Sequence, residues 1–372
     1  MKKLSYLILK DKVFLIAFVL AIVTMFIIPP SKEYFGYINY KVLVVMFTIM
    51  LSVSGIFESH LFYFIATKLV MHFKNMRFIS LSIVFTTFLL SMFLTNDAVL
   101  LTLIPFSIFI FKHINMEKHI IPIIVLQTIA ANLGSALTPM GDPQNIYLFA
   151  HYQLNFSNFI SMTLPISVIG GILVLTTTAL IFPKQIVVLN IAAPTVNLKK
   201  LFIYLIILLN ALLLILQIIP LVYAFLITLL LGLLFGRHLF KRVDWYLILT
   251  FVSFFIITGN LSQMTSIGNF FSKYLNSSNN VYLISVATSQ IISNVPAAVL
   301  LSTFTDVTYV KALLQGVNVG AMGTLVASLA SLISFKYILR DFPKMAKRYI
   351  FIYSCISIIY MVIITSIIFL IL

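Results

Sequence analysis

The sequence predicts an all-α polytopic membrane protein with two inverted-topology repeats, re-entrant hairpins and broken helices, in total about nine full spans plus two hairpins. Of its 372 residues, 62% are hydrophobic and only 9% are charged, whereas a soluble domain has about 25% charged residues. Apolar runs long enough to cross a bilayer recur along the chain, and its two halves repeat the same order of segments. These observations exclude a soluble enzyme, a disordered regulator and a fibrous protein.

Full spans are predicted where about 18–20 apolar residues follow one another. The runs of this kind are 13–30, 38–57, 119–150, 158–182, 200–219, 221–237, 245–262, 310–335 and 350–372. The first run follows Met1-Lys2-Lys3, and no small-residue cleavage site comes after it. We therefore interpret it as an uncleaved span and not as a signal peptide.

Two further apolar stretches, 78–111 and 280–305, are predicted to enter and leave the membrane on one side. In the second, too few residues remain between Asn294 and Asp306 to cross a bilayer. For the first, two options stay open: a re-entrant hairpin with a short second arm at 98–111, or two full spans. Non-helical tips at membrane depth must be buried in protein or line a watery cavity.

Each hairpin follows an amphipathic stretch, at 60–74 and at 264–275. We expect two helices that lie in the membrane interface, one on each side; the alternative is a loop with accidental periodicity. The first stretch has an apolar stripe formed by Leu61, Ile65, Leu69 and Phe73.

The distribution of Lys and Arg predicts the orientation. With a cytoplasmic N-terminus, only four of the 24 lie outside: Lys32, Lys41, Lys273 and Lys311. The net charge of +15 is then a signature of topology and not of nucleic-acid binding. An odd number of full spans places the C-terminus outside. We expect a multi-pass protein of the cytoplasmic membrane, the inner membrane of the cell.

The two halves echo each other in order and spacing. The run at 40–57 resembles that at 245–262, and the run at 119–150 resembles that at 310–335. Inverted repeats with broken helices are typical of transporters, whose sites lie where the repeats meet. The division that follows has a first membrane repeat at 1–182, a cytoplasmic linker and crossing span at 183–219, and a second, inverted membrane repeat at 220–372.

Four segments resemble a known family: FLTNDAVLLTLIPF (93–106), ANLGSALTPMGDPQNIYLF (131–149), SQIISNVPAAVLL (289–301) and GVNVGAMGTLVASLASLISF (316–335). They resemble signature segments of the ion transporter superfamily, which includes arsenite permeases, sodium/proton antiporters, and citrate and divalent-anion transporters. The chain is nearest to the arsenite-permease branch. It departs from the dicarboxylate branch, whose hairpins each carry Ser-Asn-Thr. The resemblance implies a secondary transporter whose hairpins and broken helices move together like an elevator.

Asp97, at the first hairpin tip, lies between apolar runs. A carboxylate at membrane depth marks an ion or proton path by default, although Asp97 can also cap the second hairpin arm. Asn96 and Asn294 form a symmetric pair whose amides can ligate a cation, bond an oxyanion or merely tie the tips. We expect coupling Na⁺ or H⁺ at these three residues, helped by carbonyls near Thr138 and Thr324.

Asp142 lies in a stretch with two prolines and a glycine, which should break the helix. The break exposes carbonyls for a cation and a new helix N-terminus for an anion. Asp142 can instead be the N-cap before Pro143, and its mutation should then matter less than that of Asp97. The candidate site residues are Thr95, Asn96, Asp97, Asn132, Thr138, Gly141, Asp142, Asn145, Ser293, Asn294, Asn318, Gly323, Thr324 and Ser328.

Several functions are disfavoured by residues that the chain lacks. No His, Lys or Arg maps to the middle of the membrane, so an anion would be held by helix N-termini, hydroxyls and amides. The lone Cys355 excludes an internal disulfide and a Cys metal site. Without a GxxxxGK[ST] loop, ATP-driven pumping by this chain alone is not expected.

The first hypothesis is a secondary transporter that moves a small anion or neutral oxyacid, coupled to protons or sodium. The second is a sodium/proton antiporter. The third, a non-transporting scaffold or intramembrane enzyme, is disfavoured by the repeat. No cofactor beyond a coupling ion and no enzyme activity are expected. A homodimer and a separate ATPase subunit stay open.

Overall fold

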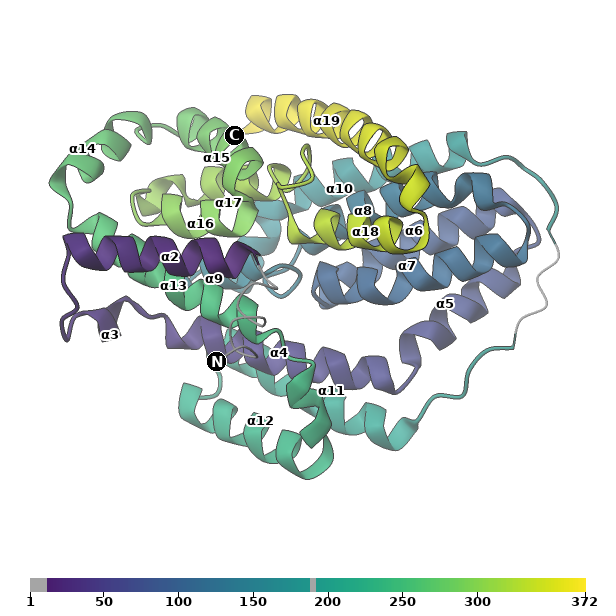
Figure 1. Cartoon of the computed structure of the whole chain (residues 1–372), viewed down its shortest axis with the longest axis horizontal. Coiled ribbons are helices and arrows are strands. Elements are labelled where there is room, and N and C mark those ends of the chain that lie inside the picture. Colours follow the sequence, from purple (N-terminus) through teal and green to yellow (C-terminus); the bar gives the residue numbers. More distant parts are fainter. Residues whose placement is uncertain (1–11, 188–191) are drawn as a thin grey trace.

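The computed structural model describes residues 12–187 and 192–372, and this part of the protein is built from helices (Figure 1). Met1-Lys2-Lys3, on which the uncleaved-span prediction depends, lies outside the described residues. An isolated bridge between Asn75 and Ile186 is the β pairing within these two ranges.

Between residues 12 and 215, apart from the gap at 188–191, the described residues form ten helices. They are α2 (Lys12–Ile27), α3 (Tyr34–Tyr37), α4 (Tyr40–Glu58), α5 (Leu61–His72), α6 (Met76–Phe93), α7 (Asn96–His113), α8 (Ile120–Ser135), α9 (Pro143–His151), α10 (Phe156–Ile181) and α11 (Leu198–Ile215).

Eight helices follow. They are α12 (Leu221–Phe235), α13 (Trp245–Ser262), α14 (Thr265–Tyr274), α15 (Ser278–Ile292), α16 (Asn294–Ser302), α17 (Val310–Val319), α18 (Leu329–Asp341) and α19 (Ala346–Ile371). Short 3₁₀ turns precede α8, α13, α17 and α19.

Seven helices of the described residues are long and apolar enough to cross a membrane: α4, α6, α7, α10, α11, α13 and α19. The prediction of a multi-pass α-helical membrane protein is therefore confirmed. The set of long helices differs from the nine predicted runs, because α2 and α12 have only 16 and 15 residues. The runs at 119–150 and 310–335 are each divided into two shorter helices.

The second arm of the first hairpin corrects a sequence prediction. We expected a short arm at 98–111, but α7 has 18 residues. It begins at the tip residue Asn96, continues through Pro105 and ends with Lys112 and His113; the positive charge of Lys112 suits a helix C-terminus. The second hairpin keeps its short arm, since α16 has nine residues. The length of α7 leaves both options for the first hairpin open.

The amphipathic stretches form α5 and α14. In α5 the buried residues are Phe62, Ala66, Thr67 and Val70, and Leu69 of the predicted stripe is exposed. The predicted stripe is thus not the face of α5 that packs inward. The buried residues each lie one or two positions away from a residue of that stripe. In α14 no residue is fully buried, but Phe271 of its apolar stripe stacks on Phe304 at 4.5 Å between ring centroids.

Two groups of helices can be distinguished in Figure 1. We call α2, α4, α11, α12 and α13 the frame helices; α4 packs on α11 and α12, and α13 packs on α2. We call α6 to α10 and α15 to α19 the core helices. In the chain, α5 and α14 connect the two groups. Contacts between the groups include α4 with α9 and α13 with α16.

Within the core helices, packing partners come in matched pairs. The second hairpin arms exchange partners, since α7 packs on α18 and α16 packs on α9. Likewise α10 packs on α17, and α19 packs on α8. Contacts of this reciprocal kind are what two related halves would make. The inverted orientation of the halves and the domain boundaries remain predictions.

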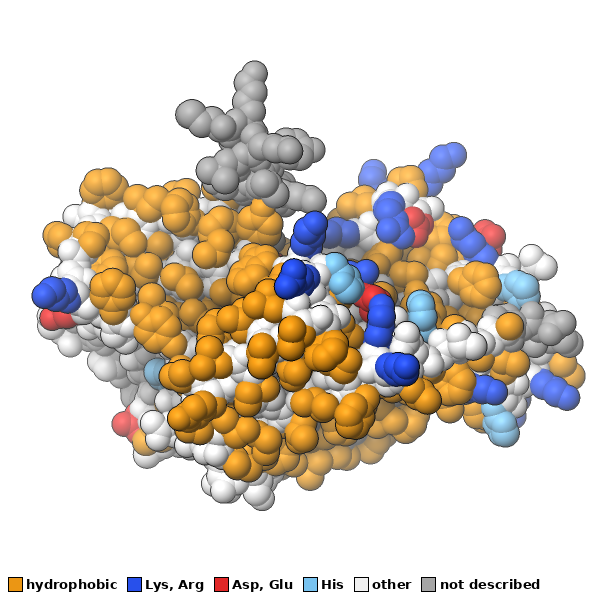
Figure 2. Space-filling view, turned by 90° about the horizontal axis from the view of Figure 1, so that it is seen from below, with side chains coloured by type: hydrophobic (Ala, Val, Ile, Leu, Met, Phe, Trp, Pro, Cys, Tyr) orange, Lys and Arg blue, Asp and Glu red, His pale blue; other side chains and the backbone are white. Residues whose placement is uncertain are grey.

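The surface has the character of a membrane protein. Large apolar side chains are widely exposed, among them Phe26 at 85%, Leu180 at 78% and Leu370 at 84%. Figure 2 shows a broad hydrophobic surface, with most of the visible Lys and Arg side chains gathered toward one end. A bilayer can cover exposed apolar side chains, and Lys and Arg gather on one side of many membrane proteins. The distribution therefore fits a protein that crosses the membrane several times.

Candidate functional site

The tip of each hairpin is joined to the neighbouring helix break by one backbone hydrogen bond. The Asn96 N–H donates to the Gly141 carbonyl at 3.0 Å, and the Asn294 N–H donates to the Ala327 carbonyl at 2.9 Å. Both asparagines are buried, at 1% exposure each. The two tip asparagines are thus enclosed by protein, as membrane depth requires, whereas the second break exposes Thr324 and Val326.

The two asparagine side chains also fix their own tips. Asn96 Oδ1 accepts the Asp97 N–H at 2.8 Å, and Asn294 Oδ1 accepts the Val295 N–H at 3.0 Å. One lone pair of the Asn96 oxygen therefore remains for a ligand, whereas Asn294 Oδ1 also accepts the Ser293 hydroxyl at 3.3 Å. The tying role and the ligand role are thus compatible for the Asn96 oxygen.

Asp142 is the most enclosed acid of the site, with 4% exposure. It occupies the N-cap position of α9, with Pro143 as first helical residue. Its carboxylate makes no cap hydrogen bond, so the interpretation of Asp142 as a simple N-cap is wrong for its side chain. The carboxylate instead accepts a hydrogen bond from Asn96 Nδ2 at 2.9 Å, which draws it toward the first hairpin tip.

Side-chain amides extend this contact across the two halves. Asn96 Nδ2 also donates to Asn132 Oδ1 at 3.2 Å, and Asn132 Nδ2 donates to Ser328 Oγ at 3.1 Å. A second link runs from Asn318 Nδ2 to Asn145 Oδ1 at 2.8 Å. We call this set the polar centre: Asn96, Asn132, Asp142, Asn145, Asn318 and Ser328.

Three buried polar atoms around the polar centre have no hydrogen-bond partner: Asp97 Oδ1, Gln144 Oε1 and Asn294 Nδ2. The Asn294 amide lies close to the Asp142 carboxylate but outside hydrogen-bond geometry. Buried polar atoms in proteins are nearly always paired. The free acceptors suit a cation or a proton, and the free donor suits an anion or a neutral oxyacid.

Asp97 and Asp142 differ in how they are held. Asp97 lies in the first turn of α7 and is partly exposed, where a helix N-terminus favours negative charge. Its Oδ1 has no hydrogen-bond partner, whereas Asp142 is fixed by Asn96. The geometry therefore supports Asp142, more than Asp97, as the anchored acid of the site.

Several predicted site residues lie at the edge of the polar centre. Thr138 donates to the Met92 carbonyl, and Thr95 precedes α7 without making a cap bond. Thr324 is exposed, and its hydroxyl donates to the Gln290 carbonyl at 3.2 Å. The Thr138 and Thr324 hydroxyls thus satisfy backbone carbonyls, the commoner fate of such groups.

The remaining predicted residues shape the backbone. Ser293 has φ 76° and Gly323 has φ 105°, so both hold the chain in the left-handed region that favours glycine. Gly141 allows a close approach, because a Cβ there would lie 2.3 Å from the Ser135 carbonyl oxygen. We conclude that these residues position the site.

Two glutamines were missed by the sequence analysis. Gln144 is fully buried beside Asp142 and donates to Asn318 Oδ1 at 3.4 Å. Gln290, on α15, donates to the Gly320 and Met322 carbonyls at 2.7 and 2.8 Å. The position of Gln144 within the broken stretch could have indicated it, but the role of Gln290 depends on contacts distant in sequence.

Metal ligands of the common kinds do not gather here. Among the described residues, no group of three or more His, Cys, Asp or Glu could hold a metal ion. Sodium, which prefers oxygen ligands, would have to use Asp97, amide oxygens of the Asn96 and Asn294 pair, and free carbonyls. These residues are neighbours of the polar centre, and the sodium site remains a prediction.

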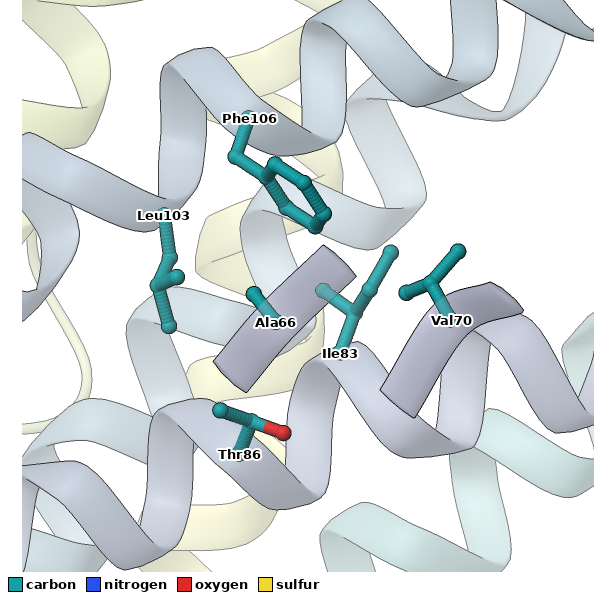
Figure 3. A pocket seen from close by; sticks show the side chains of 6 residues that line it. All are labelled: Ala66, Val70, Ile83, Thr86, Leu103 and Phe106. Carbon is teal, nitrogen blue, oxygen red and sulfur yellow. The ribbon is translucent and has the colours of Figure 1, made fainter. Parts of the chain in front are cut away.

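The narrow gap shown in Figure 3 is not part of this site. It lies between α5, α6 and α7 and is lined mainly by apolar side chains such as Ala66, Ile83 and Phe106. It leaves no space for a water-sized sphere, so it cannot hold a solute. We interpret it as a packing defect beside the link between frame and core.

Comparisons with known proteins agree with this architecture. A transporter of Methanocaldococcus jannaschii, described as uncharacterized, is 32% identical over 312 residues, which cover 82% of each chain. Inner membrane protein YbiR of Escherichia coli is 28% identical over 336 residues, 88% of this chain and 87% of the relative. A Dictyostelium discoideum protein named as a transporter, arsB, is 26% identical over 159 residues, 43% of this chain and 28% of the relative.

Fold, polar centre and relatives together define a membrane transporter and not an enzyme. The citrate transporter family matches residues 2–312, and the chain belongs to that family. The resemblance to the ion transporter superfamily is thereby confirmed.

Proposed function

We propose that this protein is a secondary active transporter that carries a small anion or a neutral oxyacid through the polar centre. The observation that supports it most is the buried Asp142 carboxylate at the meeting point of a hairpin tip and a helix break, linked by amides to the second half. A charge so enclosed at membrane depth is costly and marks a transport path.

The chemistry of the substrate follows from the donors and acceptors around the polar centre. The amide of Asn294 is a buried donor without a partner, and α9 begins beside Asp142 with its N-terminus turned to the same place. Amides and helix N-termini bind carboxylate or oxyanion groups. The printed name of the family supports a small carboxylate, and the arsenite-permease resemblance supports a neutral oxyacid.

Asp142 supplies the coupling step in this proposal. An anion cannot bind beside a buried carboxylate unless that charge is neutralised, either by a proton or by sodium. Cation and substrate would therefore load together, and downhill entry of the cation would drive uptake. Asp97, with its free Oδ1, is a second place for the same cation.

Flux into proteoliposomes tests the proposal. Citrate, phosphate and arsenite would each be offered as radioactive or chemically assayed solutes, with a proton gradient, a sodium gradient or neither. Uphill accumulation of one solute under one gradient supports a coupled transporter. Absence of any solute flux, with the protein folded and inserted, would contradict the proposal.

Sodium/proton exchange is a second candidate function. It is favoured by the two acids near one another and by the absence of Lys or Arg from the hydrogen bonds of the described polar centre. In the same vesicles it would appear as sodium-driven proton movement without added anion. That result would replace the first proposal by the second.

A further inference from the structure

A cavity of about 590 Å³ opens where the frame helices meet the core helices. Its frame side comes from the segment before α4, the start of α4, and α13; its core side comes from α9 and the residue after α16. Residues that line it and bear on the argument are Asn39, Lys41, Tyr147, His151, Thr258 and Thr303.

The cavity lies one short helix away from the polar centre. Helix α9 has nine residues, and it runs from Pro143, beside Asp142, to His151 in the cavity lining. At 1.5 Å per residue, nine residues span about 13 Å. The volume and the short distance together fit a chamber in which a small solute waits before it reaches the polar centre.

Tyr147 stands between the cavity and the polar centre. It is 3% exposed, and its ring stacks on that of His151 at 5.2 Å between centroids. Its hydroxyl lies 2.8 Å from Ser302 Oγ, which joins α9 to the end of α16. This pair closes the inner wall with side chains from the two halves.

The charge of the lining selects the solute. Lys41 and His151 are the basic side chains of the lining, and no carboxylate is among its residues. Two acids outside the lining are held by neutral donors: Glu33 accepts from Gln263 at 3.1 Å, and Asp306 accepts the Thr308 N–H and hydroxyl at 2.9 Å each. Both keep their negative charge but do not line the cavity. The N-terminal end of α4 also lies in the lining, where the helix dipole adds positive potential, although Asn39 Oδ1 already accepts the Val42 N–H at 3.2 Å.

We propose that this cavity is an access vestibule for small anions, with Lys41 as its attracting charge and the Tyr147–Ser302 pair as its inner wall. This inference rests on the proposed transport function, because it names where the anion is first collected. The vestibule opens on the side that the Lys and Arg distribution assigns to the outside. An enclosed basic cleft raises the local concentration of anions and the rate at which they react or bind.

Thiol labelling tests the vestibule without reference to a substrate. The native chain has one cysteine, Cys355, which is exposed on α19, so Cys355→Ser gives a thiol-free background. Thr303→Cys then places a nearly isosteric thiol in the cavity. Rates of modification are measured in proteoliposomes with two methanethiosulfonate reagents, an anionic sulfonate and a cationic trimethylammonium. The ratio of the anionic to the cationic rate at Ser157→Cys, an exposed position, provides the reference.

At position 303 we expect the anionic reagent to be favoured about tenfold over that reference ratio. Lys41→Met should remove the preference, Lys41→Arg should keep it, and Lys32→Met, outside the lining, should leave it unchanged. A cysteine at 303 that reacts with neither reagent, or a preference that survives Lys41→Met, would overturn the vestibule.

Transport gives an independent readout. If the proposed function holds, Lys41→Met should raise the half-saturating concentration of the carried anion about tenfold and leave the maximal rate within about twofold. A charge preference in labelling together with sodium/proton exchange and no anion flux would count against the proposed function, while the cavity would still be an anion-collecting site.

Discussion

The helix breaks of the two halves are built alike and carry different chemistry. Each break receives the backbone N–H of an asparagine from its own hairpin tip. In the first half, the residue before the new helix is Asp142, which makes no cap bond and faces the hairpin. In the second half it is Ser328, whose side chain accepts the Ser331 N–H as an ordinary cap. The backbone arrangement is thus repeated in both breaks, but only the first break has a carboxylate at the position before the new helix.

The breaks are also tied down from different places. Asn145, within α9 itself, donates to the Ser135 and Thr138 carbonyls of the first break at 3.0 and 3.3 Å. The second break is held from outside by Gln290 of α15. Its side-chain amide donates to the Gly320 and Met322 carbonyls and accepts the Thr324 N–H. The first break also receives bonds from other helices, since the Asn96 N–H and the Thr163 hydroxyl donate to the Gly141 and Leu137 carbonyls at 3.0 Å each. The two breaks therefore differ in which side chains hold them.

The largest effect should come from Asp142→Asn. Loss of the charge removes a charge-assisted hydrogen bond worth about 1.5–3 kcal/mol, which corresponds to about a 10- to 100-fold change in rate. Gradient-driven uptake should fall by about 100-fold, while asparagine keeps the size of the side chain. Flux assays measure the uptake, and size-exclusion profiles of the same preparation check that the variant is folded. Normal uphill transport by this variant would show that the two breaks are functionally equal.

Gln290→Leu should have the next largest effect, on stability. It leaves three backbone groups of the second break without their partner, and each net hydrogen bond is worth about 0.5–1.5 kcal/mol. We expect a loss of about 2–4 kcal/mol in the free energy of unfolding, seen as a lower midpoint in detergent melts. Gln263→Leu, on an exposed site, is the matched control and should change the midpoint little.

The sequence predicted the order of the elements better than the direction of their side chains. Helices α4 and α13 begin within two residues of the predicted runs at 38–57 and 245–262, directly after the capping residues Asn39 and Asp244, because capping is a local property of the chain. Pro139, Gly141 and Pro143 placed the first break for the same reason. By contrast, the length of α7, the turn of Asp142 toward Asn96 and the role of Gln290 depend on groups from other helices.

The same limit explains the ranking of the two acids. From sequence, Asp97 had the stronger claim, because it sits between apolar runs at a hairpin tip, and Asp142 could be dismissed as a cap. The cap hydrogen bond is absent, and only the packed structure brings Asn96, 46 residues away, onto that carboxylate.

Asp97→Val sharpens the comparison of the tips, since Val295 occupies the matching place in the second half. Asp97 holds no hydrogen bond at Oδ1, so we expect a smaller loss of uphill transport than for Asp142→Asn, about tenfold. Downhill exchange of the solute should persist, because the polar centre keeps its amides. Counterflow in vesicles without a gradient separates the two rates, and Asp97→Asn controls for the change in polarity.

Ser328→Ala should have the smallest effect, and it tests whether the second break is only structural. The substitution removes the cap of α18 and the acceptor for Asn132 Nδ2. Loss of a cap costs about 1 kcal/mol, and Asn132 keeps its second acceptor, the Ala321 carbonyl at 3.3 Å. We therefore expect a modest drop in melting midpoint and a transport rate within about threefold of the native protein, since 1 kcal/mol corresponds to less than tenfold. A loss as large as that of Asp142→Asn would mean that Ser328 itself contacts the solute, and the charge difference between the halves would then no longer separate their roles.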